Sequence, residues 1–360
     1  MSSSYLVLED GSVLEGEPFG HRGPAEGEVV FSTCMSGYQE SLADPASGGQ
    51  VIVMTYPLVG NYGVSGEFFS TRSLRARGLV VREYCKEPSP MYGGRTLDEL
   101  LRRDGVPGIS GIDTRDLAIR IRSAGTLRGA LTEDEGGIDG LAKRLRLSPF
   151  PHERDLAGEA SCKRISTHGS GKGVRMGVLD LGDGEGAMRA LSRDFDVTVF
   201  PHDTPADVIS AHKVKGLVVS DGPGDPSHPA ILSTAARAVS DLSPLMPVFG
   251  MCLGGLVVAA AMGGATHKMR AGHRGGNQPV RYEGRVLITS QNHGFAVDPH
   301  RPGDDMVVDQ VNVNDGTAEG ARHRGLPLQT SMYRPSASPT PGGMPLPFDR
   351  FVKTVKGGSA

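Results

Sequence analysis

The C-terminal half of the chain alternates short apolar runs with amphipathic segments. The apolar runs, which predict buried strands, lie at 174–181, 197–200, 216–220 and 247–251. The amphipathic segments, which predict helices, lie at 186–195, 205–212, 230–242 and 253–262. This strict alternation is typical of right-handed βαβ units, so we predict a doubly wound, flavodoxin-like parallel sheet. After residue 264 the pattern changes to short strands and turns, and a last helix is expected near 347–355.

The N-terminal half has a different pattern, in which strands come first and helices follow. Short β-type runs occupy 5–8, 27–31, 51–55 and 78–81, and helical patterns occupy 96–104, 113–124 and 138–145. Thr96 and Asp113 stand at the start of two of these helices, where their side chains can cap free backbone N–H groups. We therefore predict a separate mixed α/β domain.

A stretch rich in Pro, Ser, Gly and charged residues separates the two halves. It lacks an apolar period, so residues 149–173 are predicted to be a linker. This gives two domains, residues 1–148 and 174–356, which agrees with a length of 360 residues.

Charge and cysteine content narrow the class of protein. Lys and Arg number 38 against 41 Asp and Glu, which argues against a nucleic-acid-binding chain. The four cysteines show no CxxC spacing, so neither a disulfide framework nor a metal site is expected. The first residues lack the basic and apolar parts of a secretion signal, and no apolar run reaches membrane-spanning length. We therefore expect a cytoplasmic protein that does not enter a membrane.

Cys252 occupies the most distinctive local motif. It follows a predicted buried strand and precedes Leu253-Gly254-Gly255 at the start of an apolar helix. A nucleophile elbow has this arrangement, and the helix N-terminus can lower the pKa of a thiol and hold an oxyanion. The alternative interpretation is an inert cysteine buried at the end of a strand.

A rigid turn, Gly-Pro-Gly-Asp-Pro at 222–226, follows another predicted buried strand. Its glycines allow backbone N–H groups to approach a ligand closely. It lacks the lysine and glycine spacing of a phosphate-binding loop. It is either a plain βα turn or, because ligands bind at the strand C-termini of such sheets, part of a site beside Cys252.

Together these motifs resemble the class I glutamine amidotransferase domain, and more narrowly the small chain of carbamoyl-phosphate synthetase. The resemblance rests on GPGDP (222–226), GMCLGG (250–255), AGHRGGNQPV (271–280) and TSQNHGFAVD (289–298). The N-terminal half resembles that small chain's own first domain at 27–33, 36–41, 55–63 and 108–115. The resemblance covers nearly the whole chain.

The resemblance implies a reaction and a partner. In this family a cysteine attacks the amide of glutamine, ammonia leaves, and water releases glutamate. The ammonia passes to a large chain, which uses ATP, Mg²⁺ and bicarbonate to make carbamoyl phosphate for arginine and pyrimidines. No cofactor or metal is implied for the small chain itself.

The resemblance also assigns residues by position. Cys252 is the expected nucleophile, and the N–H of Leu253 with a glycine of the 222–226 turn is the expected oxyanion hole. Glutamine-contacting positions correspond to Gly222, Gly224, Leu253, Asn292, Gly294 and Phe295. In the first domain, Ala46 stands where a serine normally reaches the glutamine site, and Ser47 is adjacent.

Three further positions depart from the family pattern. Arg334 stands where the family has its general base, a histidine, and Ser336 stands where a glutamate follows it. Arginine stays protonated, so it can neither accept a proton from Cys252 nor give one to ammonia. Loss of general acid–base catalysis typically costs about 10² to 10⁴ in rate. Leu256 replaces a substrate-contacting glutamine, which removes a polar partner worth about 1–3 kcal/mol.

Two hypotheses follow. The chain is either the glutaminase subunit of carbamoyl-phosphate synthetase, slowed or rescued by an unseen base, or a catalytically impaired subunit. His228, His273 and His293 are considered as that base, but the favoured interpretation of each is an ordinary polar loop residue. The impaired subunit would act as a scaffold or regulator of an ammonia-using large chain. A third reading, a class I amidotransferase that serves another synthase, is disfavoured by the N-terminal motifs.

Overall fold

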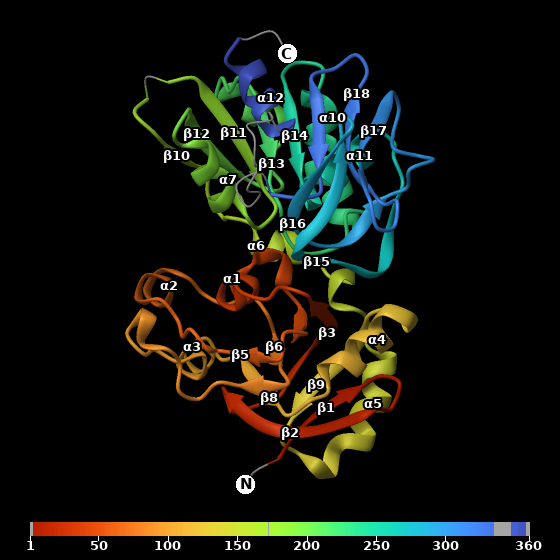
Figure 1. Ribbon diagram of the computed structural model, residues 1–360. Coiled ribbons are helices and arrows are strands. Elements are labelled where there is room, and N and C mark those ends of the chain that lie inside the picture. The colour runs from red at the N-terminus through yellow and green to blue at the C-terminus, as the bar shows by residue number, and fades with distance from the viewer. Residues whose placement is uncertain (1–2, 172, 335–346, 358–360) are drawn as a thin grey trace. The chain divides into compact units, whose positions relative to one another are not determined.

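A computed structural model describes residues 3–171, 173–334 and 347–357. It divides into two compact units, Met1–Glu153 and Arg154–Ala360, each with its own core. The division falls within the stretch that the sequence marks as a linker. In Figure 1 the first unit runs from red to yellow and the second from yellow-green to blue.

The first unit is built around a closed barrel. Among the described residues, seven strands form it in the order β1-β2-β8-β6-β4-β3-β9. Their bounds are β1 (Ser4–Leu8), β2 (Val13–Gly20), β3 (Ala25–Ser32), β4 (Gln50–Met54), β6 (Gly78–Val80), β8 (Pro107–Ser110) and β9 (Leu127–Thr132). A small sheet pairs β5 (Leu58–Val59) with β7 (Glu83–Tyr84).

Helices pack against this barrel in separate apolar clusters. They are α1 (Tyr38–Ala43), α2 (Gly66–Thr71), α3 (Leu97–Arg103), α4 (Thr114–Ala124) and α5 (Ile138–Leu147). The strand period of two explains why both faces are buried. Val51 and Val53 of β4 pack with Leu117 of α4. The alternate residues, such as Ile52, pack in the cluster that contains Leu100 of α3.

The second unit contains a sheet of ten described strands, ordered β10-β12-β11-β13-β14-β19-β18-β16-β15-β17. Five of them are parallel neighbours: β12 (Asp196–Pro201), β11 (Arg175–Asp180), β13 (Leu217–Val219), β14 (Val248–Met251) and β19 (Leu328–Ser331). When these five strands are numbered by their order in the chain, their order across the sheet is 2-1-3-4-5. This is the order of a flavodoxin-like sheet, so the predicted fold class is confirmed.

Helices lie on both faces of the parallel strands, as Figure 1 shows for α7, α10, α11 and α12. One core cluster joins alternate strand residues to α8 (Ala206–Ala211), α10 (Arg237–Leu242) and α11 (Leu253–Ala261). The other joins them to α7 (Gly184–Leu191) and α12 (Pro347–Val355). A π-helical turn at Leu232–Ala236 connects α9 (Pro229–Ile231) to α10.

Two sequence predictions need correction. The stretch 149–173 is not simply a linker, because it holds α6 (Leu156–Ala160) and β10 (Ser166–His168), and Ala157 of α6 is fully buried. The region after residue 264 does not consist of short strands. It forms a long hairpin of β15 (Thr266–Tyr282) and β16 (Arg285–Val297), followed by β17 (Met306–Asn312) and β18 (Ala318–His323). Glycines and polar residues inside β15 obscured its period, and register shifts interrupt the pairing at two points.

Candidate active site

Cys252 lies at the junction of β14 and α11, as the elbow motif predicts. Its backbone has φ 46° and ψ −112°, outside the regions that non-glycine residues ordinarily adopt. A nucleophile on a sharp strand-to-helix turn has this kind of strain. Cys252 is only 1% exposed, so the thiol is buried.

Small residues make this turn possible. A Cβ added to Gly254 would lie 2.2 Å from the backbone oxygen of Val219 in β13. A Cβ added to Gly250 would lie 2.5 Å from the backbone oxygen of Gly254. Both contacts are far below van der Waals distance, so the two glycines let α11 pack closely on the strands.

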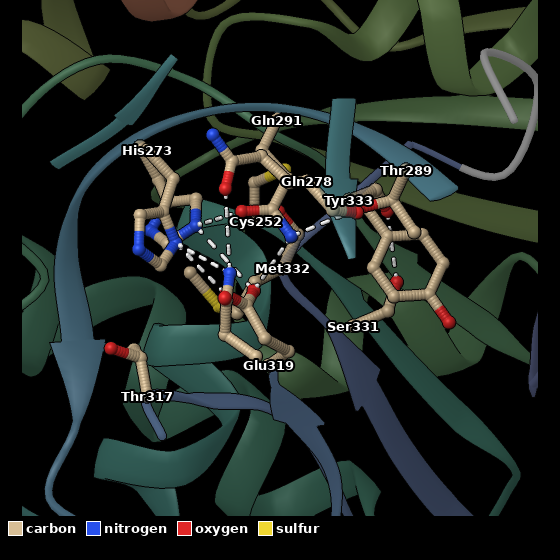
Figure 2. Close-up of polar contacts among 12 residues, drawn as sticks. Cys252, His273, Gln278, Thr289, Gln291, Thr317, Glu319, Ser331, Met332 and Tyr333 are labelled. Atoms are coloured by element: carbon tan, nitrogen blue, oxygen red, sulfur yellow. Dashed lines mark hydrogen bonds and ion pairs between the residues drawn. The ribbon is translucent and has the colours of Figure 1, made fainter. Parts of the chain in front are cut away.

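The residues that follow β19 hold the elbow in place. The N–H of Cys252 donates to the backbone oxygen of Ser331 at 2.8 Å, which continues the pairing of β14 with β19. The Cys252 thiol lies 3.3 Å from the backbone oxygen of Met332, to which it donates (Figure 2). The candidate nucleophile, Cys252, is therefore held by the residues at the end of the strand that leads to Arg334.

Two backbone N–H groups converge beside Cys252. The Gly222 nitrogen lies 2.7 Å and the Leu253 nitrogen 3.4 Å from the same oxygen, Oδ1 of Asp221. Leu253 directly follows the nucleophile, and its N–H is the donor expected of an oxyanion hole. Gly222 is the partner from the predicted turn, and a Cβ there would lie 1.9 Å from the backbone oxygen of Leu181. A carboxylate oxygen of the protein thus occupies these donors.

Arg334 holds the other oxygen of that carboxylate. Its Nη2 and Nε lie 2.8 Å and 3.1 Å from Asp221 Oδ2, and Nε lies 3.6 Å from Asp183 Oδ2. The Arg334 side chain is 27% exposed, whereas that of Asp221 is 2% exposed. At the position of the expected base the structure therefore has a permanent cation, paired with a buried anion.

Most of the other residues expected to contact glutamine lie in the second unit. Gly224 adopts a φ of 109°, which favours glycine. Leu256 is buried in an apolar cluster that includes Phe295, so it contributes packing in place of a polar contact. Asn292 and Gly294 flank His293 on β16. Ser336 lies outside the described residues.

Ser47 belongs to the first unit. Its hydroxyl donates to the backbone oxygen of Ser41 at 2.8 Å, and the side chain is 1% exposed. That contact gives Ser47 a local structural role within its own unit.

The histidines considered as replacement bases have other partners. His273 lies 2.9 Å from both Asp315 Oδ2 and Glu319 Oε1, and His293 lies 2.9 Å from the backbone oxygen of Phe295 and 3.1 Å from Gln291 Oε1. Figure 2 shows His273, Gln291 and Glu319 joined in this network. The Nδ1 of His228 accepts the N–H of Ala230 at a helix start. Each ring is thus engaged in a structural contact.

Charge coupling shifts the pKa values in this network. Burial alone would raise the pKa of Glu319, but hydrogen bonds and charge from His273 and His293 lower it to about 2. Burial alone would lower the pKa of His273, but the hydrogen bonds and charges of Glu319 and Asp315 raise it. The network is therefore built around a charged carboxylate.

The same three side chains, His273, His293 and Glu319, have potential ligand atoms within 4.8 Å of one another. Glu319 also accepts hydrogen bonds at 3.0 Å from Asn312 and Gln291. The donor atoms already satisfy one another, so we interpret the cluster as a hydrogen-bond network.

Sequence reasoning missed Asp221 and Asp183. Asp183 follows β11, and Asp221 follows β13 just before the predicted turn. Parallel strands place their carboxyl ends at one edge of the sheet, so acidic residues after two such strands and an arginine after a third are expected to meet. That signal was available once the strand order was assumed.

The comparisons with known proteins agree with this architecture. The family model described as glutamine amidotransferase class-I matches residues 186–354, and the one described as carbamoyl-phosphate synthase small chain, CPSase domain, matches residues 6–131. The amidotransferase model gives the class of the C-terminal unit. The small-chain model, which matches the N-terminal unit, narrows the family. No helix among the described residues is long and apolar enough to cross a membrane.

Curated relatives match along nearly their whole length. The carbamoyl phosphate synthase pyrimidine-specific small chain of Bacillus subtilis (strain 168) is 40% identical, over 98% of this chain and 95% of its own. The carbamoyl phosphate synthase small chain of Archaeoglobus fulgidus is 39% identical, over 98% of each chain. That of Bacillus caldolyticus is 40% identical, over 98% and 96%. This chain belongs to the family of carbamoyl-phosphate synthase small chains.

Proposed function

We propose that this chain is the amidotransferase subunit of a carbamoyl-phosphate synthase and hydrolyses glutamine through Cys252. The observation that carries the proposal is the strained elbow, which places the thiol beside the converging N–H groups of Leu253 and Gly222. Such donors stabilise the negative oxygen that forms when a thiol attacks an amide carbonyl.

The site has a thiol that can attack glutamine but lacks the family's general base. The Cys252 sulfur forms a bond to the amide carbon, and the carbonyl electrons move onto oxygen. The C–N bond then breaks, and the thiol proton must be transferred to the leaving nitrogen, which departs as ammonia. Water next bonds to the acyl carbon, one of its protons must be transferred to the sulfur as the C–S bond breaks, and glutamate is released. Arg334 can supply neither transfer, because its guanidinium stays protonated. We therefore expect turnover reduced by about 10² to 10⁴ relative to a relative with a histidine there.

A second candidate function follows from the Arg334–Asp221 pair. A subunit with such a site can serve as a scaffold or regulator of a large chain that uses free ammonia. The pair favours this reading because it replaces the base with a cation and fills the oxyanion donors with a carboxylate.

Partners and setting follow from the proposal. A large chain is the expected protein partner, and ATP, Mg²⁺ and bicarbonate are expected to bind there. Among the described residues no disulfide joins Cys34, Cys85, Cys162 or Cys252, which suits a reducing cytoplasm.

The test is glutamate release from glutamine by the purified chain, alone and with a cognate large chain. We expect slow release that Cys252→Ala reduces by about 10³ or more, because removal of a nucleophile leaves only binding effects. Carbamoyl phosphate formation from ammonia is measured in the same complex.

Cys162→Ala is the matched control. Burial, and then the charge of Asp180, raise the pKa of Cys162 to about 11, so that thiol is a poor nucleophile. Its loss should leave glutamate release unchanged. Release that is equal in the parent and Cys252→Ala chains would contradict the glutaminase proposal. If ammonia still drives the complex, that result would favour the scaffold.

A further inference from the structure

We propose that the Asp221 carboxylate is a built-in competitor for the oxyanion hole, held in place by Arg334, so that glutamine reacts at Cys252 only when this carboxylate leaves. The inference rests on the proposed function, because it concerns the same thiol. It adds a residue that controls whether the site is open.

The geometry of the carboxylate supports the inference. Its two oxygens have separate tasks: Oδ1 accepts from the Gly222 and Leu253 N–H groups, and Oδ2 accepts two contacts from the Arg334 guanidinium. An oxyanion formed at Cys252 needs the Leu253 N–H, which directly follows the nucleophile. One donor hydrogen cannot serve both oxygens fully, so the carboxylate and the oxyanion compete.

Charge adds to this competition. Asp221 is 2% exposed, and a second negative oxygen close to a buried carboxylate is strongly disfavoured. The hydrogen bond from Leu253 is long at 3.4 Å, whereas the Arg334 contact is 2.8 Å. The Arg334 guanidinium and the Gly222 N–H, at 2.7 Å, therefore anchor the carboxylate more firmly than the Leu253 N–H does.

Arg334 can hold the carboxylate in either arrangement. It is 27% exposed and has a second acidic neighbour, Asp183, at 3.6 Å. A guanidinium that already lies near two carboxylates can follow Asp221 outward, or release it and remain paired with Asp183. The closed arrangement is thus a defined state of the site, with an identifiable route to an open one.

The test uses alkylation of Cys252, which does not depend on a general base for turnover. The probe is the chloroketone analogue of glutamine, L-2-amino-4-oxo-5-chloropentanoate, whose ketone oxygen needs the oxyanion donors. The sulfur forms a bond to the chloromethyl carbon, chloride leaves, and the thiol proton goes to solvent. Iodoacetamide reports how accessible the thiol is. Mass spectrometry of the intact chain gives both rates.

Asp221→Ala should raise the ratio of the chloroketone rate to the iodoacetamide rate by about tenfold or more, because the donors become available. Asp183→Ala is the matched control: it removes the other acidic neighbour of Arg334 and leaves Oδ1 in place. Its ratio should stay within about 1.5-fold of the parent's.

Two results would overturn the inference. One is an unchanged ratio in Asp221→Ala, and the other is an equal acceleration by both reagents, which means that the substitution only loosened the site. If Asp221→Ala does not fold, Asp221→Asn carries the test. It keeps the size but loses the charge, and its ratio should rise by about threefold; an unchanged ratio counts against the proposal.

Failure of the proposed function gives a different pattern. Suppose that the parent chain shows no Cys252-dependent glutamate release but Asp221→Ala shows a raised alkylation ratio. This result would reject glutamine turnover by the parent chain and support Asp221 as a competitor for the oxyanion hole. Cys252-dependent glutamate release together with an unchanged alkylation ratio would support the proposed function and reject the competition by Asp221.

Discussion

The C-terminal unit buries two carboxylates, Glu319 and Asp221, in different surroundings. Glu319 is fully buried and accepts hydrogen bonds from His273, Asn312 and Gln291. Asp221 accepts from two backbone N–H groups at the elbow and from a partly exposed arginine. The first carboxylate takes side-chain donors that no proposed step of the reaction requires. The second takes donors that the reaction needs. Equal burial therefore accompanies opposite roles, one supporting the fold and one closing the site.

The largest expected effect on stability is that of Glu319→Gln. Lowering the pKa of Glu319 from 4.5 to about 2 corresponds to about 3 kcal/mol of stabilisation of the charged form. We expect Glu319→Gln to lower the free energy of unfolding at neutral pH by about that amount. Urea unfolding followed by circular dichroism measures it.

The pH dependence sharpens this prediction. Because the folded pKa of Glu319 is lowered, its contribution is present above pH 4.5 and is lost as pH falls towards 2. The raised pKa of His273 has the opposite sign, so its contribution is present below pH 6.5 and is lost as pH rises through the folded value. Glu319→Gln should therefore remove much of the loss of folding stability at acid pH.

The control is Glu185→Gln. Glu185 forms an exposed ion pair with Arg189 on a helix, so this substitution should change the free energy of unfolding by less than about 1 kcal/mol. Equal losses in the two variants would contradict the distinction.

A smaller effect is expected for Asp221→Ala. Arg334 keeps its partial exposure and its neighbour Asp183, so removal of Asp221 does not leave a fully buried charge unpaired. We expect a loss of about 1–2 kcal/mol in the free energy of unfolding, from the two N–H groups left with water as partner. The same urea titration measures it. A loss larger than that of Glu319→Gln would show that Asp221 is primarily structural.

The fold and the site were not equally readable from the sequence. The parallel strands around β13 and β14 were predictable because buried runs alternate with helices, and Cys252 was predictable because a small-residue turn follows such a run. The barrel strands β2 and β8 escaped notice, since β2 alternates exposed and half-buried residues and β8 is short. The substitution at Arg334 was visible, but its partner was not. Asp221 acquires its role only when β13 and β19 lie on either side of β14, which is a property of the sheet order.

The central claim is that the missing base and the filled oxyanion hole restrict the same reaction. Its most direct test is the initial rate of glutamate release by the parent, Asp221→Ala, Arg334→His and the double variant. Arg334→His alone supplies a base and removes one anchor of the Asp221 carboxylate, but the Gly222 N–H, 2.7 Å from Oδ1, still holds that carboxylate at the donors. Asp221→Ala alone opens the hole without a base. We predict that the double variant exceeds the faster single variant by about tenfold or more. A double variant no faster than either single variant would contradict the account.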